Sequence, residues 1–152
     1  MIRVFAKTLS DLTEGEMLQL QKAETCDTSE EDYLKVIYCK TASLFEAASL
    51  SAAISVNATE EMQSSVRRFA TDLGIAFQIR DDIFDYSLGM NVGKPVGADI
   101  LERKITLPLL GAFAAVDSEK EAAIRTRLRS TELDDAGREE ICEFVRVNGG
   151  LE

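Results

Sequence analysis

Apolar residues recur at helical spacing along almost the whole chain, and this pattern predicts an all-α protein. No window alternates apolar and polar residues for long enough to indicate a strand, and only two prolines interrupt the pattern. N-cap residues and breaks between the apolar segments set the helix limits. The predicted helices cover residues 4–24, 30–56, 59–86, 99–116 with a restart at Pro108, 118–129 and 134–147.

Two of these helices carry apolar surfaces that need partners. The helix over 30–56 is apolar around much of its circumference, which is typical of a central helix in a larger bundle. Its apolar positions include Val36, Ile37, Leu44, Phe45, Leu50 and Ile54. The helix over 59–86 places a second group on one stripe, namely Met62, Val66, Phe69, Leu73 and Phe77.

Composition and charge narrow the class of protein. With 152 residues, of which 45% are hydrophobic, the chain is the size of one domain. A formal net charge of -10 argues against nucleic-acid partners and against binding to an anionic membrane. No apolar window is long enough for membrane insertion, and the start does not resemble a signal peptide. The three cysteines have no C-x-x-C spacing, so we expect neither disulfides nor zinc, and a cytoplasmic location.

The chain has no histidine, so its chemistry must depend on carboxylates and lysines. Gln78, Asp81, Asp82 and Asp85 fall on an arc of about 100° near the end of the helix over 59–86. A solvated polar face is the simplest interpretation. However, Asp disfavours helix interiors, Asp81 and Asp85 repel each other, and negative charge opposes the dipole at a helix C-terminus. The cluster therefore indicates a bound cation, and Mg²⁺ with a phosphate ligand suits it.

A phosphate ligand also requires positive charge nearby. The candidates are Lys40 within the apolar second helix, Lys94 in a glycine-rich loop and Lys104 after the next helix begins. Each lysine taken singly is more simply an ordinary surface or snorkelling side chain. Asp99 and Glu102 form a pattern typical of a capping box, and we assign them to structure.

The segment from Gly74 to Asp85, GIAFQIRDDIFD, resembles the second aspartate-rich motif of trans-isoprenyl diphosphate synthases. That motif has the form G-x-x-F-Q-x-x-D-D-x-x-D. Other segments, before and after this motif, occur in the order seen in the family, so the likeness spans nearly the whole chain. They are Glu14–Leu20, Lys40–Ala42, Gly93 and Lys94 through Asp99, and Lys104–Pro108. Arg103 departs from the family, which often has glycine at this position.

The resemblance implies a helical bundle around a cavity, and Mg²⁺-dependent condensation of isopentenyl diphosphate with an allylic diphosphate. It also assigns roles to residues. Asp81 and Asp85 would hold Mg²⁺, with Asp82 in support. The catalytic and diphosphate-binding residues would be Lys40, Thr41, Gln78 and Lys94, with Lys104 as a further substrate-binding residue.

Half of the family's site has no counterpart in this sequence. The family's N-terminal half supplies a G-G-K-R-type segment and a first D-D-x-x-D motif, and neither is found here. We therefore expect residues 1–152 to be the C-terminal portion of one polyprenyl synthase domain, inactive alone. The segment Glu14–Leu20 favours a long-chain product. We expect an exposed apolar patch on Ile37, Leu44 and Phe45, and hence self-association or a homodimer.

Two other classes of function fit the sequence less well. A non-catalytic regulatory subunit of a heteromeric prenyl synthase would account for the half-length chain, but it would have no need of intact metal and lysine positions. A helical interaction module with a coincidental acidic face would have no reason to carry Lys40, Thr41, Gln78 and the aspartates in family order.

Overall fold

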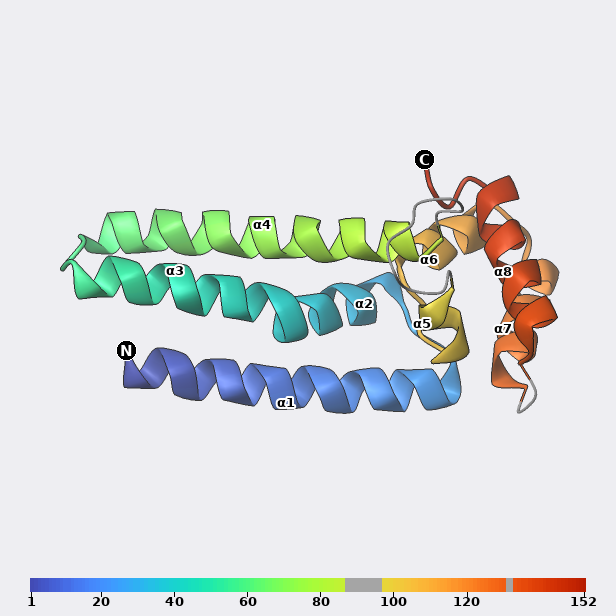
Figure 1. Cartoon of the computed structure of the whole chain (residues 1–152), viewed down its shortest axis with the longest axis horizontal. Helices are drawn as coiled ribbons and strands as arrows, with labels where there is room; N and C mark the ends of the chain where they lie inside the picture. Colours follow the sequence, from blue (N-terminus) through green and yellow to red (C-terminus); the bar gives the residue numbers. More distant parts are fainter. Residues whose placement is uncertain (87–96, 131–132) are drawn as a thin grey trace. The chain divides into compact units, whose positions relative to one another are not determined.

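The computed structural model describes residues 1–86, 97–130 and 133–152, and no strand occurs among them. The prediction of an all-α fold is confirmed (Figure 1). The helices are α1 (Ile2–Thr25), α2 (Glu30–Ile37), η1 (Tyr38–Ala42), α3 (Ser43–Ser55), α4 (Glu60–Asp85), α5 (Ala98–Leu101), α6 (Leu107–Ala114), α7 (Ser118–Arg129) and α8 (Asp135–Val147). Within the described ranges, none is long and apolar enough to cross a membrane.

The chain divides into two compact units. The first consists of Met1–Gln19 and Leu34–Ile79, and the second of Leu20–Tyr33 and Arg80–Glu152. Helices α1, α2 and α4 each contribute residues to both units.

The first unit contains an irregularity that periodicity did not reveal. The helix predicted over 30–56 is interrupted by η1, a π-helical turn that separates α2 from α3. The Ser43 hydroxyl donates to the Cys39 carbonyl at 2.7 Å, just after this turn. Single π-helical turns occur frequently at functional sites. Here the turn carries Lys40 and Thr41.

Two glycines allow neighbouring helices to approach η1 closely. A Cβ at Gly15 of α1 would lie 2.6 Å from the Cβ of Cys39. A Cβ at Gly74 of α4 would lie 2.6 Å from the Cα of Ala42. Neither position therefore has room for a larger residue. In Figure 1, α3 runs between α4 and the first part of α1.

The packing face of α4 includes small residues, and the predicted apolar stripe is exposed except at Val66, which is half-buried. Ala70 is 1% exposed and Gly74 is buried. By contrast, the large side chains of the stripe are 57% (Met62), 67% (Phe69), 46% (Leu73) and 43% (Phe77) exposed. We call these four residues the α4 stripe.

The predicted apolar patch on α2 and α3 is only partly correct. Leu44 is 48% exposed, as expected. Phe45 is half-buried, and its ring centroid lies 5.6 Å from that of Phe77. Ile37 is only 4% exposed, so its inclusion was wrong, because this chain already covers it.

The second unit has its own hydrophobic core. The fully buried large side chains include Tyr86, Ile100, Leu109, Leu128, Ile141 and Val145. Two arginines of α7 fix the connection between α1 and α2, since Arg125 donates to the Cys26 carbonyl at 2.8 Å and Arg129 to the Thr25 carbonyl at 2.9 Å. These bonds tie the start of the unit to its C-terminal helices.

A capping box begins α2. The Asp32 amide donates to the Ser29 hydroxyl at 3.1 Å, and the Asp32 carboxylate accepts from the Ser29 amide at 3.0 Å. Lys22 lies 2.9 Å from the same carboxylate. The hydrogen bond from Lys22, followed by the bonds from Ser29, lowers the pKa of Asp32 to about 2. The polar break before residue 30 therefore starts the helix, as predicted.

We expect Gly74→Ala to lower the free energy of unfolding by about 1–3 kcal/mol, because the new methyl would overlap the backbone of Ala42. Urea unfolding followed by circular dichroism would measure the change. Gly111→Ala is the control, because a Cβ there meets nothing nearer than 3.6 Å and the residue lies inside α6. It should stabilise by about 0.5–1 kcal/mol. Equal effects of the two substitutions would contradict the close packing of η1.

Candidate functional site

The first unit joins two of the predicted diphosphate ligands. The Thr41 hydroxyl, in η1, donates to the side-chain oxygen of Gln78, in α4, at 2.7 Å. The two residues are 37 positions apart in sequence, and both side chains are partly buried. This bond holds the Gln78 amide group in one orientation, with its oxygen towards Thr41 and its NH₂ group on the other side.

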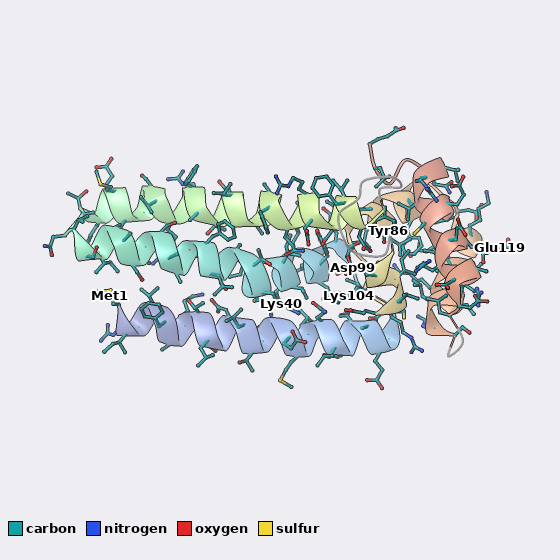
Figure 2. The ribbon with its side chains drawn as sticks, in the orientation of Figure 1. Met1, Lys40, Tyr86, Asp99, Lys104 and Glu119 are labelled. Carbon is teal, nitrogen blue, oxygen red and sulfur yellow. The ribbon has the colours of Figure 1, made fainter. Side chains whose placement is uncertain are left out.

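Lys40 is the third predicted ligand in this unit, and it faces α1 (Figure 2). Its Nζ lies 2.6 Å from a carboxylate oxygen of Glu16 and donates to the side-chain oxygen of Gln19 at 2.9 Å. The Lys40 side chain is 30% exposed, so a solvent-borne ligand can reach it. Sequence reasoning identified Lys40 but not these partners.

In the second unit, Asp82 is buried against a tyrosine. The Tyr33 hydroxyl donates to the Asp82 carboxylate at 2.7 Å, and the two residues are 3% and 5% exposed. Burial, followed by the charge of Asp82, raises the pKa of Tyr33, so its hydroxyl remains a donor at neutral pH. Tyr33 was missed because nothing in the local sequence links it to a residue 49 positions away.

Asp85 has a different environment. Its two carboxylate oxygens accept from the backbone amides of Ala98, at 3.1 Å, and Asp99, at 3.0 Å. Gly97 precedes these amides with φ of 77°, a left-handed conformation that glycine adopts without strain. Asp85 therefore caps α5 from a distant position in the sequence.

The predicted capping box of Asp99 and Glu102 was wrong. The N-cap of α5 is Gly97, which has no side chain to accept a hydrogen bond, and no side chain of α5 itself caps it. Asp85 takes the Asp99 amide that such a box would have used, and the Glu102 amide donates to the Ala98 carbonyl.

Asp99 and Lys104 form an ion pair close to α5 (Figure 2). Lys104 Nζ lies 3.6 Å from a carboxylate oxygen of Asp99, and it also contacts the Glu102 carboxylate. Burial, followed by the charges of Asp85 and Asp82, raises the pKa of Asp99 to about 6, while Lys104 opposes the rise. Lys104, predicted to bind substrate, is thus paired with carboxylates in this structure.

Two predicted site residues remain. Asp81 is exposed on α4. Lys94 lies outside the described residues. Within the described ranges, no three side chains of His, Cys, Asp or Glu are gathered as a ready-made metal site.

The carboxylates of α4 nevertheless suit Mg²⁺. This ion takes one or two carboxylates and completes its shell with water and phosphate oxygens, so a full protein cage is not required. Asp81 is accessible, and each oxygen of Asp85 retains a lone pair beyond its amide bond. Asp82, buried against Tyr33, is suited to support these residues.

The helical fold, with an aspartate-rich end of α4, is that of the isoprenoid synthases. The chain belongs to the Polyprenyl synthetase family, whose model matches residues 1–145.

Relatives and solved structures agree with this assignment. The chain is 38% identical to the octaprenyl diphosphate synthase of Escherichia coli over 99% of this chain and 47% of that protein. The structure of a decaprenyl diphosphate synthase from Rhodobacter capsulatus matches with a TM-score of 0.87 and 36% identity, over 99% of this chain and 46% of that one. A polyprenyl synthase from Caulobacter crescentus, complexed with calcium and isoprenyl diphosphate, matches with a TM-score of 0.87 and 34% identity, over 99% and 46%. The chain spans about half the length of the curated relatives it matches.

We expect Tyr33→Phe to lower the free energy of unfolding by about 1–3 kcal/mol, because the buried Asp82 carboxylate loses a donor. A double-mutant cycle with Asp82→Asn, followed by urea unfolding, would measure the coupling. The double variant should be more stable than the sum of the two single effects predicts. Additive effects would show that the two side chains do not interact.

Proposed function

We propose that this chain forms part of a prenyltransferase that condenses isopentenyl diphosphate with an allylic diphosphate into a long-chain polyprenyl diphosphate. The family match supports the class of reaction. The relatives support a long product, since they include an octaprenyl and an all-trans-nonaprenyl diphosphate synthase. The single observation that carries the proposal is the Thr41–Gln78 hydrogen bond, which joins the η1 turn to the helix of the aspartate motif.

In this proposal, Lys40, Thr41, Gln78 and Lys94 bind the diphosphate of the allylic substrate. Cationic and hydrogen-bonding groups aimed at a leaving group stabilise the charge that develops on it as the C–O bond breaks. Lys104 is a further substrate-binding residue.

Asp81 and Asp85 would hold Mg²⁺, which supplies positive charge to the departing diphosphate when bound. Asp85 also fixes the start of α5 through two amides, and the Tyr33–Asp82 bond supports the end of α4. Both contacts reduce the freedom of the helix end that carries Asp81.

We further propose that the chain lacks synthase activity alone and acts with a second set of helices. Three large residues of the α4 stripe, Met62, Phe69 and Leu73, recur at intervals of seven and four, as in a helix that packs along another helix. Their exposure supports a surface that is covered in the complete enzyme. Without that cover, we expect the chain to self-associate.

Calorimetric titration with farnesyl diphosphate tests the metal and diphosphate site. We expect weak binding that requires Mg²⁺ and that becomes at least about tenfold weaker in an Asp81→Asn, Asp85→Asn double variant, because charged ligands bind Mg²⁺ more strongly than amides do. Asn keeps an acceptor for the amides of α5. Asp72→Asn, an exposed position on the same helix, is the matched control. No binding, or binding indifferent to Asp81 and Asp85, would contradict the proposal.

Light scattering after size exclusion tests the exposed surface. We expect the unmodified chain to elute above its monomer mass of 16.7 kDa, and a Phe69→Glu, Leu73→Glu variant to elute as a monomer. Val147→Glu replaces an equally exposed residue on α8 and should change nothing. A monomeric unmodified chain would rule out self-association through the α4 stripe.

A further inference from the structure

The segment Glu14–Leu20 has no part in the function proposed so far, apart from its bearing on product length. In the structure it is the part of α1 that meets η1. Gly15 lies against Cys39 and Lys40, and Glu16 and Gln19 both contact the Lys40 ammonium. Two polar side chains of this segment therefore meet on Lys40, while Glu14 pairs with Lys35 of α2 at 2.6 Å.

The Lys40 ammonium has three donor hydrogens and no acceptor. The Gln19 side-chain oxygen, at 2.9 Å, and the Glu16 carboxylate, at 2.6 Å, can take two of them. Among the described residues these two acceptors account for two of the donors, which leaves one for a ligand. A lysine side chain is otherwise flexible, with four rotatable bonds, so two acceptors on one rigid helix restrict where the charge lies.

Gly15 makes this arrangement possible. A Cβ at this position would lie 2.6 Å from the Cβ of Cys39 and 2.9 Å from the Cγ of Lys40. Any larger residue would push α1 away from η1. At this close separation the Gln19 oxygen lies 2.9 Å from the Lys40 ammonium.

The two acceptors differ in charge and in exposure. Gln19 is neutral and partly buried, and its bond to Lys40 is partly buried too, so it can hold the ammonium while an anionic ligand is bound. The Glu16 side chain is 51% exposed and negatively charged, so an incoming diphosphate repels it and competes for the same ammonium.

We propose that Gln19 is a positioning residue for Lys40, and that Glu16 is an internal anion that occupies Lys40 until a diphosphate displaces it. This rests on the proposed function, because it takes Lys40 to be a diphosphate ligand. In this proposal, Gly15, Glu16 and Gln19 together set the position and the pairing of the Lys40 ammonium in the same site.

Competitive labelling with acetic anhydride, quantified by mass spectrometry, tests the contacts without any substrate. Lys120, exposed on α7, serves as the internal reference. We expect Lys40 to react more slowly than Lys120. Gln19→Leu, which removes a hydrogen bond, and Glu16→Gln, which removes the charge of the ion pair, should each raise the Lys40 rate about 3–10-fold. Gln19→Glu keeps an acceptor and should leave the rate low. An unchanged rate in both Gln19→Leu and Glu16→Gln would overturn the proposal.

Titration with farnesyl diphosphate and Mg²⁺ then tests the division of roles. We expect Gln19→Leu to weaken binding about 3–10-fold and Glu16→Gln to strengthen it, while Gln21→Leu and Glu24→Gln, exposed controls on α1, have no effect. Weaker binding in Glu16→Gln would refute the displaced-anion role.

If the unmodified chain binds no diphosphate, the proposed function fails, and the labelling still decides whether Gln19 and Glu16 hold Lys40. Matching thermal unfolding of all variants ensures that the rates report contacts and not folding.

Discussion

The first unit depends on the close contact of η1 with two glycines. Gly15 of α1 and Gly74 of α4 each lie where a single added carbon would come within 2.6 Å of the turn. Protein interiors are packed so densely that even one methylene is felt, so the contact can be made only by residues without side chains. The contact brings side chains of α1 and α4 within hydrogen-bonding distance of η1. Gln19 meets Lys40 and Gln78 meets Thr41 because the backbones are this close.

The π-helical turn adds a second constraint to the same place. A turn with i→i+5 bonds is rare, and within an α-helix it appears as a single wide turn. A wider turn shifts the angular positions of the side chains within it and after it, and Lys40 and Thr41 lie inside this turn. In this structure Lys40 bonds to α1 and Thr41 to α4. Two adjacent residues thus form hydrogen bonds to two different helices.

The helices could be predicted from the sequence because helix formation is governed by local periodicity and caps. Asp117 and Asp134 cap α7 and α8 through their side chains, and both helices lie within one residue of the predicted limits. The turn η1 could not be predicted, since its residues fit an α-helical pattern equally well. Contacts between distant residues left no local signal either. For example, the residues next to Tyr33 in the sequence do not indicate that its hydroxyl bonds to Asp82.

The charge of the three aspartates at the end of α4 is only part of the argument for a bound cation. The sequence shows three aspartates at a helix end, and their repulsion argues for a cation. In the structure, two of the three have internal partners, because Asp82 accepts from Tyr33 and Asp85 accepts from two amides. Their presence in the helix is therefore partly explained without a metal. The negative charges of Asp85 and Asp82 also act on Asp99. Burial is the larger cause of the raised pKa of Asp99, and these two charges add to it. The physical case for a cation thus rests on this remaining charge and on the exposed Asp81, and it is narrower than the motif alone suggests.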